Sequence, residues 1–111
     1  MKHDLLDAMV RGWFVGDFSP AVAHSSNFEV AVQRYPAGAK EAKHFHPVAT
    51  EITAIVSGRA LMFEREWKEG DILTISLGEA TAFEALTDVV TVVVKIPSAK
   101  NDKVFVETGK P

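Results

Sequence analysis

The 111-residue sequence contains no cysteine. Disulfide bridges, thiol catalysis and cysteine-based zinc sites are therefore excluded, because each of them needs the thiol sulfur. A chain without cysteine also suits the reducing cytoplasm, and we expect the protein to work there. No signal peptide is expected, since Asp4 and Asp7 interrupt the apolar run that such a segment needs.

Long apolar segments and a strong charge of one sign are lacking as well. The most apolar stretch, residues 89–96 (VVTVVVKI), is far too short to cross a bilayer, so no membrane partner is expected. A formal net charge of −3 gives no reason to expect a nucleic acid partner. Hydrophobic residues make up 47% of the chain, which is enough for the core of one domain over residues 1–111.

The pattern of residues predicts an all-β fold with a short N-terminal segment. We expect residues 4–12 to form one short helix or an arm, and residues 27–35 to alternate between two faces of a strand. Further strands are expected over residues 12–18, 41–46, 50–57, 59–63, 71–76, 80–85, 88–96 and 102–106. Residues 64–66 are interpreted as a solvated hairpin tip. Many short strands separated by frequent turn signals predict a β-sandwich or barrel.

Two of the four histidines lie one residue apart in the stretch HFHPVATE, residues 44–51. Side chains alternate along a strand, so His44 and His46 share a face, with Cα atoms roughly 6.5 Å apart. Glu51 opens the returning strand after a short connection. Two imidazoles and one carboxylate form a facial triad, which suits Fe(II), Mn(II), Ni(II) or Zn(II) and leaves positions open for substrate or water.

Residues 38–58 resemble the first motif of the cupin superfamily, G-x5-H-x-H-x3,4-E-x6-G. Its fixed positions are occupied by Gly38, His44, His46, Glu51 and Gly58. The resemblance covers about residues 28–96 and implies a double-stranded β-helix, or jelly-roll barrel, with a pocket at its mouth. It also implies a small single-domain cupin that forms a homodimer, which would cover open sheet edges.

The second cupin motif, G-x5-P-x-G-x2-H-x3-N, is only partly present. Gly70 and Gly78 match it, whereas its proline, histidine and asparagine are replaced by Ser76, Thr81 and Ala85. In cupins that bind metal through three histidines and one glutamate, the histidine of this motif is the fourth ligand. Threonine is a poor ligand for a divalent transition metal.

The threonine leaves three interpretations open. His44, His46 and Glu51 could form a three-ligand site completed by water. A carboxylate from Glu79 or Glu84 could replace the missing histidine. Otherwise the pocket holds no tight metal, and its histidines contact a ligand or act as acid and base.

Other residues are candidates for the pocket wall. Alternation from Thr81 places Phe83 inward. One of Arg34 and Tyr35 must face the interior, and the sequence leaves open which. Arg59 and Lys95 could hold an anionic substrate or instead extend along a barrel rim.

Two functions remain in view. The intact first motif favours a metal-dependent isomerase, epimerase or lyase acting on a small polar metabolite, such as a sugar or sugar nucleotide. With iron, oxygen chemistry would also be open. Thr81 favours a non-catalytic module that binds a small molecule and regulates a neighbouring enzyme.

Overall fold

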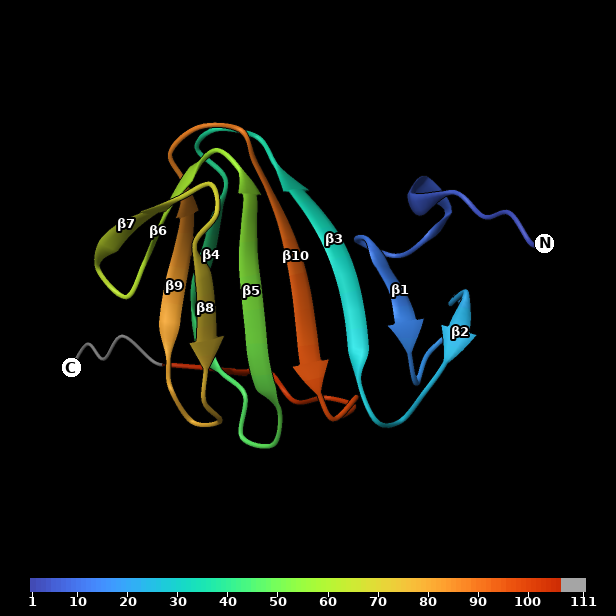
Figure 1. Cartoon of the computed structure of the whole chain (residues 1–111). Coiled ribbons are helices and arrows are strands. Elements are labelled where there is room, and N and C mark those ends of the chain that lie inside the picture. The colour runs from blue at the N-terminus through green and yellow to red at the C-terminus, as the bar shows by residue number, and fades with distance from the viewer. Residues whose placement is uncertain (107–111) are drawn as a thin grey trace.

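The computed structural model describes residues 1–106 and consists almost entirely of two facing β-sheets (Figure 1). The six-stranded sheet has the order β2 (Ala23–His24), β1 (Trp13–Gly16), β3 (Glu29–Tyr35), β10 (Val89–Ile96), β5 (Thr50–Ser57) and β8 (Ile72–Ile75). The five-stranded sheet has the order β11 (Val104–Phe105), β4 (Lys40–Phe45), β9 (Thr81–Ala85), β6 (Arg59–Met62) and β7 (Arg65–Lys68). The expected all-β jelly-roll fold is confirmed.

The N-terminal segment is an arm with a single turn of 3-10 helix, η1 (Leu6–Ala8). A longer helix does not form because Leu5, at its start, provides no side-chain cap, and none of its residues is buried. Arg11 and Gly12 then take positive φ angles of 49° and 82°, which end any helical path. No helix within residues 1–106 is long and apolar enough to span a membrane.

One sequence-based expectation on the strands is wrong. Arg65 and Glu66 belong to strand β7, not to a hairpin tip. The tip lies at Phe63 and Glu64, whose φ angles of 53° and 60° are typical of a tight two-residue hairpin turn. Glu66 on β7 forms an ion pair of 2.8 Å with Arg59 on the neighbouring strand β6, and this pair stabilises charged residues in the two strands.

The hydrophobic core lies between β6, β8, β9 and the first residue of β10. Its buried members are Ala60, Met62, Leu73, Ile75, Phe83, Ala85 and Val89. Gly58 makes the turn between β5 and β6 at a φ of 88°, and an added Cβ would lie 2.1 Å from the carbonyl oxygen of Asp88. This position therefore needs glycine, which explains the last fixed residue of the first motif.

The strands β3, β10 and β5 run side by side in the six-stranded sheet, and their register sets the site. Glu29, Lys95 and Glu51 are direct neighbours in one row across these strands. The apolar strand β10 lies within this sheet between β3 and β5, and its inner face is the more buried one. Its outer side chains are half-buried or exposed, as with Ile96 at 48% exposure.

Candidate functional site

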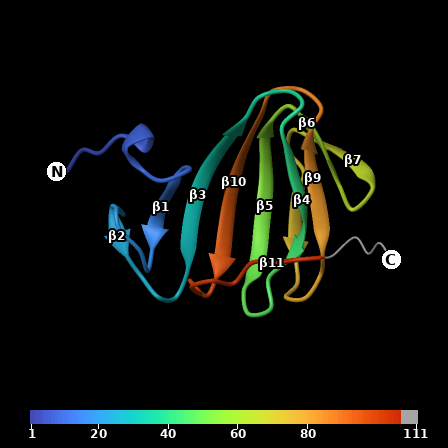
Figure 2. The ribbon, with the colours of Figure 1, turned by 180° about the vertical axis from the view of Figure 1, so that it is seen from behind.

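The loop that joins β4 to β5 carries the second histidine and is held by the C-terminal part of the described chain. The Asp102 carboxylate accepts the backbone N–H groups of Val48 and Ala49 at 2.9 and 2.8 Å. Asp102 is only 8% exposed. Figure 2 shows β11, which follows Asp102, crossing beside β4. The site is thus closed by a segment far away in the sequence, and sequence reasoning missed it.

His46 is buried and has one ring nitrogen fixed. Its Nδ1 lies 2.7 Å from the carbonyl oxygen of Asp102. A carbonyl can only accept, so Nδ1 carries the proton in this contact and donates it. In the neutral ring Nε2 is then left as an acceptor.

The free nitrogen of His46 faces a carboxylate. Nε2 lies 3.2 Å from Oε1 of Glu51, which is within hydrogen-bonding distance. The ring is nevertheless not aligned to bond it, and Nε2 is buried without a hydrogen-bond partner among residues 1–106. With Nδ1 engaged by Asp102, Nε2 of His46 and the Glu51 carboxylate lie 3.2 Å apart and face each other, and a bound cation would contact both.

Glu51 is fixed on the inner face of β5. Its Oε2 accepts a hydrogen bond of 2.6 Å from the Thr53 hydroxyl. Burial alone would raise the pKa of the Glu51 carboxyl, but His46, Thr53 and the charge of Lys95 outweigh it and lower this pKa. The carboxylate is thus ionised at neutral pH.

His44 lies beside His46 at the end of β4. The two ring centroids are 5.2 Å apart, in an edge-on arrangement. The Nδ1 of His44 donates to the carbonyl oxygen of Ala42 at 2.9 Å, which leaves its Nε2 as an acceptor too. Burial lowers the pKa of the His44 ring, so the ring is neutral and able to bind a metal.

The three first-motif residues share one wall of the interior without forming a finished metal site. Within residues 1–106, no group of three histidine, aspartate or glutamate side chains is already arranged around a common point. His46 and Glu51 are in contact, and His44 packs against His46. The donor set fits a divalent transition metal in chemistry, since two imidazoles and one carboxylate line the same cavity.

Thr81 lies on β9, directly beside His44 in the register of the five-stranded sheet. Its hydroxyl accepts the backbone N–H of Phe63 at 2.7 Å and donates to the carbonyl oxygen of Ala82 at 2.8 Å. Both hydrogen-bonding roles are thus used by the backbone. The two candidate replacement carboxylates are placed differently. Glu79 accepts the N–H of Ser76 at 2.8 Å. Glu84 follows the buried Phe83 on β9 and therefore lies on the opposite face of that strand.

Tyr35 is the member of the Arg34–Tyr35 pair that faces the interior. Its ring packs on Phe83 with centroids 4.5 Å apart. Its hydroxyl lies 2.6 Å from Oε1 of Gln33 and 3.2 Å from Oε2 of Glu41. Burial, and then the charge of Glu41, raises the pKa of the Tyr35 phenol, which stays protonated. Arg34 is at the outer margin, with a side chain 63% exposed and an ion pair of 3.4 Å to Asp7.

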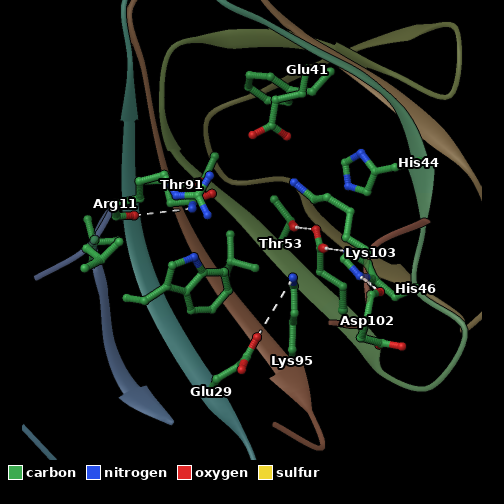
Figure 3. A pocket seen from close by; sticks show the side chains of 18 of the residues that line it. Arg11, Glu29, Glu41, His44, His46, Thr53, Thr91, Lys95, Asp102 and Lys103 are labelled. Carbon is green, nitrogen blue, oxygen red and sulfur yellow. Dashed lines mark hydrogen bonds and ion pairs between the residues drawn. The ribbon is translucent and has the colours of Figure 1, made fainter. Parts of the chain in front are cut away.

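These side chains line a cavity of about 1080 Å³ (Figure 3). Lys95, which the sequence offered as a candidate for an anionic substrate, is in its wall. The polar groups in the wall that sequence reasoning did not assign to the site include Glu29, Glu41, Thr53, Thr91, Asp102 and Lys103. The positions of these residues depend on long-range pairing.

No protein-family model and no curated protein sequence matches the chain. Solved structures do. The DMSP lyase DddQ from Ruegeria pomeroyi is 22% identical with a TM-score of 0.72, and the match covers 88% of this chain and 52% of the lyase. The chain thus spans about half the length of that enzyme.

Two further structures have a length closer to that of this chain. An uncharacterised protein with a double-stranded β-helix domain from Klebsiella pneumoniae is 19% identical, with a TM-score of 0.72 and coverage of 96% and 93% of the two chains. KdgF from Halomonas is 20% identical, with a TM-score of 0.64 and coverage of 72% and 77%. These matches show that the chain has a double-stranded β-helix fold, which is the fold that the resemblance of residues 38–58 to the first cupin motif implies.

Proposed function

We propose that the chain is a metal-dependent cupin enzyme in which His44, His46 and Glu51 bind a divalent transition metal. The observation that carries this proposal is the buried Nε2 of His46, which lies 3.2 Å from the Glu51 carboxylate and has no hydrogen-bond partner among residues 1–106. A metal in this place would polarise a carbonyl or hydroxyl oxygen of a small polar metabolite, or lower the pKa of a bound water. The structurally similar oxalate decarboxylase from Bacillus subtilis has Mn(II) centres, which supports a divalent metal in a protein of this fold.

The chain's own residues can supply the rest of a lyase, isomerase or epimerase reaction. Such reactions need a base that removes a proton from carbon next to a carbonyl group. Glu41 lines the cavity and is 3.2 Å from the protonated Tyr35 hydroxyl. We assign the proton-accepting role to the Glu41 carboxylate, with Tyr35 as the group that orients it. The similar fold of a DMSP lyase supports the lyase class over the other two.

A second candidate is a binding or regulatory cupin without tight metal. It is favoured by Thr81, whose hydroxyl is fully used by backbone partners and leaves the metal one protein ligand short. Both candidates place a small-molecule ligand in the same cavity, so metal binding separates them.

The experiment is metal analysis of the full chain purified without chelator, followed by titration with Zn(II) and Mn(II). We expect one metal per chain, and an affinity about 100-fold weaker in His46→Ala, because a ligand is removed. His24→Ala is the matched control, since His24 is exposed on the edge strand β2. Substoichiometric metal that is the same in the wild type and in His46→Ala would contradict the enzyme proposal.

We also propose that the chain forms a homodimer in the cytoplasm. The outer face of the six-stranded sheet carries apolar side chains and no charge at its centre, including Val92 between Val32 and Ala54. Such a face offers nothing to select a charged partner, whereas a second copy would present an identical flat apolar face. The cysteine-free composition fits a reducing compartment.

A further inference from the structure

Lys95 is a half-buried lysine in the cavity wall, and its ammonium makes no hydrogen bond to residues 1–106. Its side chain is 15% exposed, and its ammonium lies 3.9 Å from Oε1 of Glu29, beyond hydrogen-bonding distance. The ammonium is also 5.0 Å from the ring centroid of Trp13. Figure 3 shows it pointing into the cavity between Glu29 and His46. An ammonium has three donors, and these face open space.

The two carboxylates beside Lys95 are each held by another group. Oε2 of Glu29 accepts the Ser98 hydroxyl at 2.8 Å, and that hydroxyl in turn accepts the N–H of Asp17 at 2.9 Å. Glu51 accepts the Thr53 hydroxyl. The position of these carboxylates therefore does not depend on Lys95, so the lysine is available to a ligand.

The net charge around Lys95 changes once the proposed metal is present. The inference therefore rests on the proposed function. Glu29, Lys95 and Glu51 together carry one net negative charge. A divalent ion at Glu51 reverses this to one net positive charge. An uncompensated charge in a buried site is unfavourable, so the loaded site favours a ligand that brings one negative charge.

We propose that Lys95 and Trp13 form a subsite for the carboxylate of a small organic acid. The carboxylate accepts hydrogen bonds from the Lys95 ammonium, and the indole of Trp13 packs against the adjoining carbon atoms. The rest of the molecule reaches toward His44, His46 and Glu51. A phosphate dianion fits less well, since one ammonium must offset it between the two carboxylates of Glu29 and Glu51.

The test uses the fluorescence of Trp13 in the full chain. Trp67→Phe leaves Trp13 as the single tryptophan. This protein is loaded with Zn(II) and titrated with glycolate or with its neutral counterpart glycolamide. We expect saturable binding of glycolate that is about tenfold weaker for glycolamide and about tenfold weaker in Lys95→Met, because the charge pair is lost.

Two further variants complete the experiment. Lys95→Arg keeps the charge and should bind glycolate more tightly than Lys95→Met. Lys100→Met is the matched control, since Lys100 is 72% exposed and pairs with Asp17 outside the cavity wall. Its glycolate affinity should equal that of the parent protein.

Several results would overturn the subsite. Equal glycolate binding by Lys95→Met and its parent is one, and equal binding of glycolate and glycolamide is another. Failure of glycolate, acetate and propionate alike to bind is a third. If Lys95→Met does not fold, Glu29→Gln decides: removing the competing anion should tighten glycolate binding severalfold, and weaker binding would contradict the subsite.

The metal proposal is tested separately, by titration with Zn(II) alone. Lys95-dependent glycolate binding by a protein that does not bind zinc would refute the metal and keep the subsite. Zinc binding without Lys95-dependent glycolate binding would refute the subsite and keep the metal.

Discussion

The two faces of the six-stranded sheet differ over β3, β10 and β5. The inner face carries polar groups, namely Glu29, Gln33, Glu51, Thr53, Thr91 and Lys95, together with the buried apolar residues Ala31, Ile55, Val89 and Val93. The outer face carries Val30, Val32, Ile52, Ala54, Val92 and Val94 in the alternating positions. A sheet with one solvated face normally turns its apolar side inward. Here the outer face is apolar at its centre, while the inner face mixes polar and apolar side chains.

This difference supports the two proposals made above, a small-molecule ligand on the inner face and a second copy of the chain on the outer face. Buried polar groups cost free energy unless they are satisfied, so an inner face rich in them suits a ligand. An apolar outer face suits a second protein surface. Adjacent residues of one strand, such as Thr91 and Val92, can therefore be used to test the two faces independently.

The largest effect is expected on the outer face. Val92→Asp places a carboxylate at the centre of the proposed dimer interface, where burying it without a partner is costly. We expect the dimer dissociation constant to rise about 100-fold, measured by sedimentation equilibrium. Ala82→Asp is the control, because Ala82 is exposed on β9 of the other sheet. A wild-type protein that is monomeric at micromolar concentration would refute the homodimer and leave the apolar outer face unexplained.

The next largest effect is expected from Asp102, which holds the loop that carries His46. Asp102→Ala removes the acceptor of two backbone N–H groups in the loop before Glu51. We expect the free energy of unfolding to fall by about 2 kcal/mol. The zinc affinity should fall about tenfold, because the support of a metal ligand is lost. Both are measured on the same preparation, by urea unfolding without metal and by zinc titration.

A matched variant separates the two consequences. Asp71 accepts the N–H of Lys68 at 2.8 Å and holds a turn in the same way, far from His46 in the fold. Asp71→Ala should lower stability while leaving the zinc affinity unchanged. An unchanged zinc affinity in Asp102→Ala as well would show that Asp102 is a structural clamp only.

The sequence predicted the fold because the residues that mark its turns are required there by the local backbone. Gly58 stands where a Cβ would clash with the Asp88 carbonyl, so its place in the motif reports a real turn. The alternation at Thr81 and Phe83 predicted two inward side chains, and both are buried. These features depend on the local backbone, which a short stretch of sequence specifies.

The remaining features depend on contacts between distant segments. Alternation over residues 27–35 defines two faces of a strand but not which face is inward, and here the apolar face is outward. Asp102 reaches the site through a carbonyl oxygen and a loop, which no local pattern encodes. Tyr35 and Arg34 were separable only once the register with β10 was known.

A smaller effect is expected from restoring the second motif. Thr81 and His44 are neighbours across β9 and β4, so Thr81→His places a third imidazole next to the first-motif residues. We expect zinc to bind about tenfold more tightly, at some cost in stability because the N–H of Phe63 loses its acceptor. Isothermal titration calorimetry provides the affinity. Thr81→Val is the control, since it loses the hydroxyl without gaining a ligand; the same affinity in both variants would show that the imidazole at this position does not reach the metal.

The smallest effect tests how well the inner face is satisfied without a ligand. Thr91 is 1% exposed, and its hydroxyl has no hydrogen-bond partner among residues 1–106. Thr91→Val replaces this hydroxyl with a methyl group of similar size, so the metal-free protein should gain about 1 kcal/mol in its free energy of unfolding. Thr53→Val, in contrast, removes the donor to Glu51 and should lose stability in the same urea experiment. If Thr91→Val is also destabilised, the Thr91 hydroxyl must be satisfied in solution by a group that enters the cavity, and the inner face is then polar because it is occupied.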